Sequence, residues 1–536
     1  MKKPIRRLSG KIKREYIHSL NRRRIARISK QIPDNDPENP EQAPILIFNA
    51  STRLEEISLN AGFSLVTGWA LRQAGYPVIH FVCARGMSRC VLGTDRKDPI
   101  LAPPCTRCIR TSRDIYQNCS VRAFEFEMNK EMKEQLEPLS LEELLQFKYG
   151  GIPYGKLILP SLRWILRRHH LPDDEDTCRL ARHYILSAEN IQREFDNLLD
   201  QAEPQAVIVF NGMFYPEAVA RYLAQRRDIP VYTHEVGMLP HSVFFTSGEA
   251  TAYPIDIPDS FTLNESQQQQ LDDYLLKRTT GKFSTAGVEF WPEMQGLDPV
   301  LQKDMQVFQA VVPVFTNVVF DTSQAHANVV FPHMFAWLEA VLKAIHTHPE
   351  VLFIIRAHPD ELRPGKESEE TVAQWIGKNN VLDLPNVRFI NAREYVSSYE
   401  LIKVAKFVMV YNSTIGLEAT IFGKPVLCAG KARYTQLPTV FFPPSKKEFC
   451  AQLEDFLVQE KIDLPAQFVD NARKVLYHQL FLASLPFDEF LEDENYWKGY
   501  VKMLNFDPEK LKADRSLSIR TILRGIQEKE QFLQET

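Results

Sequence analysis

Short apolar runs alternate with helix-length segments along most of the chain. In the first half these runs occupy 44–51, 77–83, 206–212 and 230–237. In the second half they occupy 311–321, 351–359, 387–391, 407–413 and 425–430. Strands of this length joined by helices are typical of βαβ units, which form parallel sheets with helices on both faces. We therefore predict an α/β fold with two Rossmann-like domains facing a cleft.

Polar stretches set the predicted domain boundaries. The parts are a basic leader and linker (1–43), an amino-terminal acceptor domain (44–250) with a Cys-rich insertion (83–119), an interdomain connection (251–305), a carboxyl-terminal donor-binding domain (306–445) and a helical tail (446–536). A chain of 536 residues is too long for one core, which agrees with this division.

Charge and hydropathy narrow the function classes. The net charge of −4 gives no global attraction to nucleic acid, and no apolar run is long enough to span a membrane. The amino end lacks the apolar core of a secretory signal, so we predict a cytoplasmic protein. Residues 1–30 are densely basic, with Glu15 as their only acid. This leader is either a solvated helix or a peripheral contact with the anionic inner face of the membrane.

Two strand ends in the second half carry polar and basic residues. One apolar run stops at Arg356 and His358, and another stops at Asn412, Ser413 and Thr414. In open α/β sheets, ligands bind outside the carboxyl ends of the strands. Ser or Thr before a helix caps it, and the free N–H groups there favour an anion. The two ends together predict a phosphate site, and the simpler alternative is a well-capped helix.

The same residues carry a family resemblance. RAHPDE, NSTIGLEATIFGKPV and GKARY resemble the carboxyl-terminal domain of capsule polysaccharide biosynthesis proteins, which are similar to GT-B glycosyltransferases and to the Kdo transferases of capsule assembly. The resemblance runs from Asn317 to Tyr434. It implies a nucleotide-sugar donor, with a CMP-linked sugar as one candidate, and a glycan or lipid-linked acceptor.

The resemblance also assigns roles to residues of the site. His358 would contact the donor phosphate beside Arg356, and Ser413 and Thr414, which follow Asn412, would complete the cradle. Glu418 would suit a ribose or sugar hydroxyl, or would be a solvated helix residue.

The catalytic base should come from the amino-terminal domain, because an inverting enzyme must deprotonate the acceptor hydroxyl. Glu235, at the end of the run 230–237, is the first candidate. Asp321 would orient the substrate or act as a base, and a loop cap is the alternative. Other strand ends of this domain, expected to line the same cleft, are Asn49, Ser51, Asn211 and Gly212.

Cysteines gather in the insertion of the first domain. Cys83 and Cys90 precede the pair Cys105 and Cys108, which has C-x-x-C spacing, and Cys119 follows. In a reducing compartment such clustering favours metal over disulfides. Four thiolates suit zinc or an iron–sulfur cluster. Thiols in a long loop, or disulfides, are the alternatives.

The sequence thus predicts a glycosyltransferase that transfers sugar from a nucleotide donor to a surface or capsular polysaccharide or to a lipid-linked acceptor. Three alternatives remain open. Two are enzymes of the same fold, a glycerophosphotransferase and a sugar-nucleotide 2-epimerase. The third is a non-catalytic, metal-stabilised assembly factor of polysaccharide biosynthesis.

Overall fold

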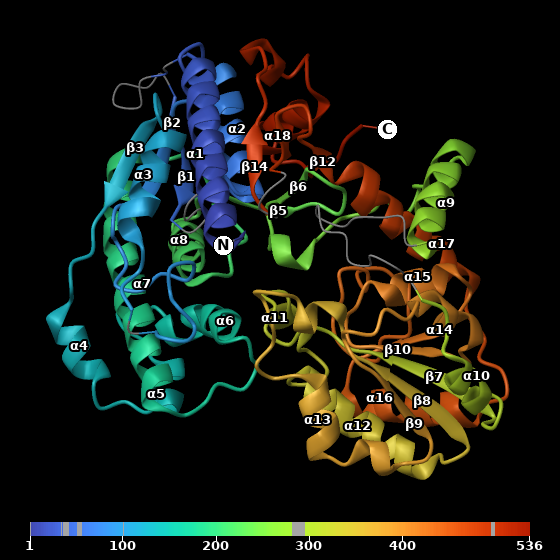
Figure 1. Cartoon of the computed structure of the whole chain (residues 1–536). Coiled ribbons are helices and arrows are strands. Elements are labelled where there is room, and N and C mark those ends of the chain that lie inside the picture. Colours follow the sequence, from blue (N-terminus) through green and yellow to red (C-terminus); the bar gives the residue numbers. More distant parts are fainter. Residues whose placement is uncertain are drawn as a thin grey trace.

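The computed structural model describes residues 2–535 except 34, 36–41, 51–55, 100, 281–294 and 495–498, with side chains from Lys13 onward. Ser51, predicted to line the cleft, lies outside these residues. The described chain forms two α/β domains, and Figure 1 shows the second, in yellow and orange, below the first.

The first domain is built on a sheet of seven described strands in the order β12-β6-β5-β4-β1-β2-β3. The strands are β1 (Ile45–Asn49), β2 (Val78–Cys83), β3 (Ser120–Phe124), β4 (Ala206–Phe210), β5 (Val231–Val236), β6 (Ser242–Thr246) and β12 (Leu485–Pro486). Strands β1 to β5 run parallel, whereas β6 and β12 are antiparallel to their neighbours. The apolar runs predict β1, β2, β4 and β5, which are almost entirely buried, but miss β3, most of which is at least partly exposed.

The second domain has a sheet of five described strands, all parallel, in the order β11-β10-β7-β8-β9. The strands are β7 (Ala310–Phe315), β8 (Val351–Arg356), β9 (Val387–Ile390), β10 (Val408–Val410) and β11 (Val426–Cys428). When the five parallel strands of each domain are numbered along the chain, their order across the sheet is 3-2-1-4-5 in both domains. This is the order of the first five strands of a Rossmann fold. The prediction of two Rossmann-like domains is confirmed.

Helices cover both sheets. Those of the first domain are α2 (Leu59–Gln73), α3 (Cys105–Ile115), α4 (Lys130–Leu136), α5 (Leu141–Gln146), α6 (Tyr154–Leu166), α7 (Glu175–Ala202) and α8 (Tyr215–Arg226). The connection contains α9 (Glu265–Thr279) and α10 (Pro299–Met305). Those of the second domain are α11 (Gln324–Ala327), α12 (Met334–Thr347), α13 (Val372–Lys378), α14 (Ser398–Val404), α15 (Ile415–Ile421), α16 (Lys446–Val458) and α17 (Ala466–Tyr477).

The segment after 445 differs from the predicted helical tail. Helices α16 and α17 are followed by β12, by the hairpin of β13 (Leu491–Asp493) and β14 (Val501–Met503), and by α18 (Leu517–Gln527). Leu485 pairs with Val243 at the edge of the first sheet. Strands of two or three residues are too short to produce a recognisable alternation, which explains the wrong prediction. The carboxyl-terminal elements thus return to the first domain, where Figure 1 shows them in red beside α2.

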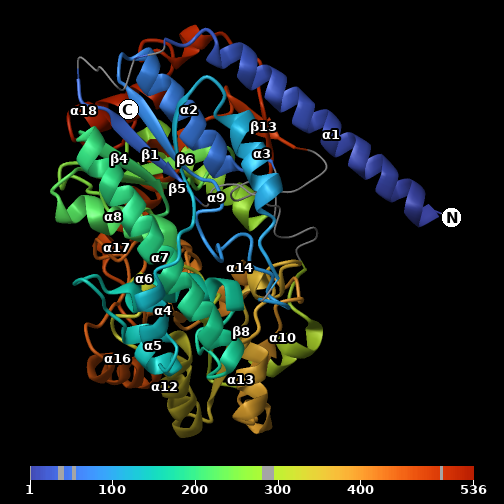
Figure 2. The same cartoon turned by 90° about the vertical axis from the view of Figure 1, so that its left-hand side faces the viewer.

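The basic leader forms α1 (Lys2–Ser29), one end of which extends away from the body in Figure 2. Its last turns are packed rather than solvated. Ile25 and Ile28 are buried, and the Arg24 guanidinium donates to the Met503 carbonyl at 2.6 Å. The second half of the leader is therefore part of the first domain. Among the described residues, no helix is both long and apolar enough to cross a bilayer.

Candidate active site

One cavity with two lobes lies between the domains. The first lobe has a volume of about 280 Å³ and the second about 460 Å³. Both are lined by Asp321, His358, Asp360, Ser413, Thr414 and Arg433. The walls come from residues after β7, β8 and β10, so the cavity opens at the carboxyl edge of the second sheet. Strands β7 and β10 are where the strand order reverses, the place at which such sheets bind ligands.

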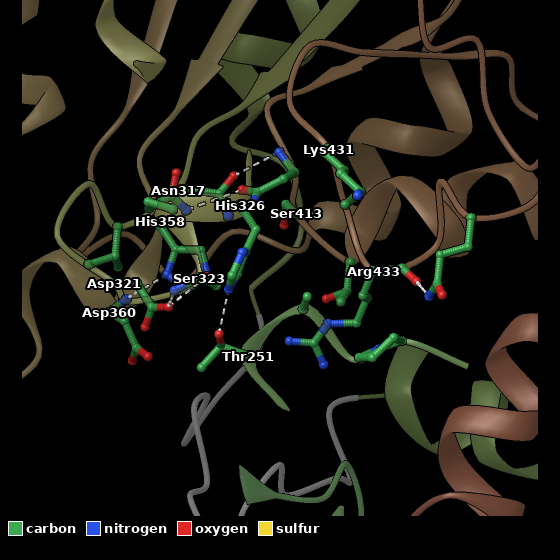
Figure 3. A pocket seen from close by; sticks show the side chains of 18 residues that line it. Thr251, Asn317, Asp321, Ser323, His326, His358, Asp360, Ser413, Lys431 and Arg433 are labelled. Carbon is green, nitrogen blue, oxygen red and sulfur yellow. Dashed lines mark hydrogen bonds between the residues drawn. The ribbon is translucent and has the colours of Figure 1, made fainter. Parts of the chain in front are cut away.

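His358 enters the cavity after β8 with a defined ring orientation (Figure 3). Its Nδ1 accepts a hydrogen bond from the backbone N–H of Asp360 at 3.1 Å. Burial lowers the pKa of His358, so the ring is neutral at neutral pH. Because Nδ1 is an acceptor, the proton of the neutral ring resides on Nε2. His358 therefore offers one N–H donor of the kind that binds a phosphate oxygen.

Asn412, Ser413 and Thr414 follow β10 as predicted, and all three line the first lobe. Thr414 is the N-cap of α15, but its side chain makes no capping hydrogen bond. Its hydroxyl is thus not used by the helix. Since α15 has only seven residues, hydroxyls and basic side chains, rather than a helix dipole, provide the polar surface here.

Two basic residues that the predicted site lacks complete the first lobe. Lys431 and Arg433 belong to the GKARY segment after β11 and line the cavity in Figure 3. The Arg433 guanidinium lies 4.0 Å from the ring centroid of Tyr253, which belongs to the interdomain connection. Such a cation–π contact fixes the side chain while its charge still faces the cavity. The basic residues after a glycine were the available signal in the sequence.

Arg356 and Glu418 lie deeper than predicted. Arg356 lines the second lobe but is buried, donates to the Ser398 hydroxyl, and has its pKa lowered by burial to about 10. Glu418 lines neither lobe. Its carboxylate accepts hydrogen bonds from Tyr399 Oη at 2.5 Å and pairs with Arg278 at 2.9 Å. The prediction that Glu418 contacts a sugar or ribose, or is solvated, does not agree with this buried ion pair.

Glu235 is the carboxylate that the first domain contributes to the second lobe, from the end of β5. Its Oε2 accepts a hydrogen bond from Asn211 Nδ2 at 2.7 Å, and its Oε1 accepts one from the Val236 N–H at 2.9 Å. Burial raises the pKa of Glu235, and the nearby carboxylate of Asp321 raises it further. A carboxylate with a raised pKa in a cleft is a candidate general base.

Asp321 lines both lobes and also caps its own loop. Its Oδ1 accepts from the backbone N–H of Ser323 at 2.9 Å and from the Ser323 hydroxyl at 2.6 Å. The predicted loop cap is thus present, and the carboxylate that it holds remains exposed to the cavity.

Of the other strand-end residues predicted to line the cleft, the three that the structure describes, Asn49, Asn211 and Gly212, do not line the cavity. Asn49 is buried, accepts from the Ser64 hydroxyl at 2.8 Å and lies 3.1 Å from His80 Nδ1. Gly212 adopts a φ of +77°, which glycine tolerates in a tight turn. Asn211 does not line the cavity, but it donates to Glu235 and to the Thr322 hydroxyl of the second domain. Among the described strand ends of the first domain, that of β5 lines the cavity.

Histidines join the two domains beside the cavity. His326 Nδ1 pairs with Glu249 at 2.8 Å, and its Nε2 lies 2.8 Å from the Thr251 hydroxyl. The hydrogen bond between His326 and Glu249 is the main reason why the pKa of Glu249 falls to about 2. Both ring nitrogens are engaged, so His326 holds the domains together rather than a ligand.

A second histidine group lies at the contact between the loop before α7 and the start of α12. His169, His170 and His333 form the only described group whose ligand atoms all lie within 4.8 Å of one another. His333 Nδ1 caps α12 by accepting from the Ala336 N–H, so its Nε2 carries the proton. His169 Nε2 lies 3.3 Å from the Arg163 guanidinium, which only donates. With those lone pairs engaged, the group fits an interdomain contact better than a metal site.

The predicted metal ligands do meet. Cys83, Cys90, Cys105 and Cys108 line one small cavity at the end of β2, away from the two-lobed cavity. Their arrangement carries a separate inference below.

Comparisons with known proteins agree with the motifs of the second domain. Residues 295–437 match the model of a family described as "Capsule polysaccharide biosynthesis protein". The match contains β7 to β11 and the residues 317–434 in which the resemblance was predicted.

One curated relative matches over a short part of its length. "Protein FixF" of Sinorhizobium fredii (strain NBRC 101917 / NGR234) is 33% identical over 101 residues, which are 19% of this chain and 21% of the relative. The matched part is thus about a fifth of that protein.

Solved structures that resemble the chain include "Thermosulfurimonas dismutans KpsC, beta Kdo 2,4 transferase", at 13% identity and a TM-score of 0.35 over 57% of this chain and 87% of that one. Another is UDP-GlcNAc 2-epimerase from Neisseria meningitidis, at 13% identity and a TM-score of 0.22 over 81% and 99%. The fold assignment rests on the two strand orders and not on these overlaps.

Proposed function

We propose that the protein is a GT-B glycosyltransferase that moves a sugar from a nucleotide donor to a surface or capsular polysaccharide or to a lipid-linked acceptor. One observation carries this proposal: a single cavity joins hydrogen-bond donors and cations of the second domain to a carboxylate of the first. The family of residues 295–437 supports the same class of pathway.

The donor occupies the second-domain side of the cavity. The Nε2–H of His358 and the hydroxyls of Ser413 and Thr414 bind the phosphate oxygens. Lys431 and Arg433 add the charge that makes such hydrogen bonds stronger. A CMP-linked sugar is one candidate donor.

The chemistry takes place where the two lobes meet. Glu235 accepts the proton of an acceptor hydroxyl, and the acceptor oxygen forms a bond to the anomeric carbon. The bond from that carbon to the phosphate oxygen breaks, and the nucleotide leaves with the electron pair. Its negative charge faces His358 and the cations, which stabilise it. Asp321 orients the acceptor and keeps the pKa of Glu235 raised.

Helix α1 suggests where the protein acts, which we propose is at the surface of an anionic membrane. Its basic side chains, of which Arg23 is exposed, favour an anionic membrane face. Co-sedimentation with phosphatidylserine vesicles that salt abolishes is the expected result, and equal sedimentation with neutral vesicles contradicts this part alone.

A nucleotide screen followed by product analysis tests the function. CMP, CDP, UDP and GDP are compared by thermal shift, since a ligand that binds only the folded state raises its stability. The sugar nucleotide of the stabilising base is then supplied with capsular or lipid-linked glycan. Sugar added to the glycan supports the proposal. Polyol phosphate added to the glycan, an epimerised free nucleotide sugar, or binding without turnover each contradicts it.

A further inference from the structure

The four clustered cysteines come from three separate parts of the first domain. Cys83 ends β2, Cys90 lies in the following loop, and Cys105 and Cys108 lie in the first turn of α3. They line a single cavity whose remaining walls are mostly apolar: Ala50, Met87, Leu92, Pro103, Pro104 and Ile109. Burial of four thiols alone does not require that all four line the same cavity.

Two of the four sulfurs are held in the same local motif. The Gly86 N–H donates to Cys83 Sγ at 3.2 Å, and the Gly93 N–H donates to Cys90 Sγ at 3.2 Å. Each cysteine is thus followed three residues later by a glycine whose amide points at the sulfur. Hydrogen bonds from backbone amides favour the thiolate, and they surround the sulfurs of metal–thiolate sites.

The backbone is shaped to make these turns. Arg85, between Cys83 and Gly86, has a φ of +65°, which is uncommon for a residue other than glycine. At Gly93 a Cβ would lie 2.7 Å from Cys90 Sγ, so only glycine lets the amide approach. Strained conformations of this kind cluster at functional sites.

The second pair is placed by α3, an eleven-residue helix that begins at Cys105. Cys108 is the fourth residue of the same helix. A helix N-terminus stabilises thiolates, because its free N–H groups and dipole favour negative charge.

The spacing of the sulfurs decides between the two metals. Around one zinc ion, with Zn–S bonds of about 2.3 Å, tetrahedral sulfurs lie about 3.8 Å apart. In the described residues, no three of these sulfurs lie within 4.8 Å of one another, since only the histidine group does. This spacing is wider than one zinc ion requires and agrees better with the ligands of a multi-iron cluster, which have the inorganic core between them.

We propose that Cys83, Cys90, Cys105 and Cys108 bind an iron–sulfur cluster of the [4Fe–4S] type. Each thiol releases one proton to water, and its thiolate replaces one ligand of a preassembled cluster. One S–Fe bond forms as the bond from that iron to its former ligand breaks, so the iron and the sulfur keep their oxidation states.

The cluster would act on the segment between its ligands. Arg96 lies in the loop from Cys90 to Cys105 and donates to the Gly365 carbonyl of the second domain at 3.4 Å. Gly365 is close in sequence to Arg363, which lines the second lobe. A cluster that fixes this loop therefore stabilises one contact between the domains. The inference is independent of the proposed transferase activity.

Metal analysis of the full chain, purified without air, tests the proposal. We expect about four iron atoms and four acid-labile sulfides per chain, visible charge-transfer absorption, and an electron paramagnetic resonance signal after reduction with dithionite. Stoichiometric zinc without sulfide overturns the cluster in favour of a mononuclear site. Absence of both metals overturns any metal role.

Variants assign the ligands. Cys90→Ala and Cys105→Ala should lose the iron and the absorption, whereas Cys450→Ala, in α16 of the second domain, should keep both. Circular dichroism identifies variants that fail to fold, and the metal content of the unaltered protein decides the question even if they do. Full iron content in a folded Cys90→Ala protein contradicts the assignment.

Discussion

The two domains share one strand order but use their strand ends differently. In the first domain, Asn49 at the end of β1 is buried and engaged by Ser64 and His80. In the second domain, the ends of β7, β8 and β10 open into the cavity. Strand order thus determines where a ligand can bind, and local hydrogen bonding determines whether the place is available. The first domain contributes mainly the carboxylate of Glu235, and the second contributes the cations.

Removal of that carboxylate should have the largest effect. Glu235→Gln keeps an oxygen for the hydrogen bond from Asn211 but cannot accept a proton at neutral pH. Because general base catalysis contributes about 10²- to 10⁴-fold, we expect kcat to fall by at least about a hundredfold. Donor affinity, measured by calorimetry, should change little. Unchanged kcat would show that Glu235 is not the base. Glu400→Gln, at a half-exposed position of α14 outside the cavity lining, is the control.

Loss of a hydrogen-bond donor on the second-domain side of the cavity should mainly weaken nucleotide binding. His358→Ala removes the Nε2–H and should weaken nucleotide binding by about tenfold to a hundredfold, the value of a hydrogen bond to a charged group. The exposed His346 of α12 gives the matched variant, His346→Ala, which should bind normally. Equal affinity in the two variants would remove the phosphate role from the second domain.

The packing of Gly416 in α15, just after β10, provides a third test. A Cβ at Gly416 would lie 2.6 Å from Tyr434 Oη and 3.0 Å from Val410 Cγ2. Gly416→Ala should therefore destabilise the protein by about 1–3 kcal/mol. At Gly377, an exposed position of α13, nothing lies within 4 Å of a Cβ, and Gly377→Ala should stabilise by about 0.5–1 kcal/mol. Denaturant unfolding measures both, and a neutral Gly416→Ala would mean that the glycine is kept for a ligand.

The smallest expected effect is a change in how the free energy of unfolding depends on pH, through Glu361 of the second domain. Burial raises the pKa of Glu361 to about 7, and its Oε1 accepts from the Val372 N–H at 2.7 Å. The folded state therefore holds a proton that the unfolded state releases near pH 4.3. The stability from this group is complete below about pH 4.3 and is lost as the pH rises through about 7.

Glu361→Gln keeps the acceptor and should flatten that part of the stability profile between about pH 5 and about pH 8. Unfolding free energies at both ends of this range provide the measurement. A slope equal to that of the unaltered protein would assign it to other groups.

The sequence predicted the two α/β domains and most of the strand-end residues of the second domain. The features that it did not predict depend on contacts between distant parts of the chain. The buried parallel strands were recognisable because both of their faces are apolar. His358, Ser413 and Thr414 were recognisable because they stop such runs. Glu418 was misread because its partner Arg278 lies 140 residues earlier along the chain, in α9, where no local pattern reveals an ion pair.

Other features needed three dimensions. Arg433 has no neighbour in sequence that indicates its contact with Tyr253. The glycines that follow Cys83 and Cys90 were present in the sequence, but their amide contacts to sulfur required coordinates. Strand β12 has only two residues and pairs with a strand about 240 positions away.

The return of the carboxyl end to the first domain has a consequence for biosynthesis. Phe487 packs edge-on against Phe63 of α2, and α18 contributes Ile519 and Ile522 to the same core. When β1 to β6 have left the ribosome, that face of α2 still lacks its cover. The five strands of the second domain, all between Ala310 and Cys428, are synthesised before the cover. The domain that is translated first therefore completes its folding last.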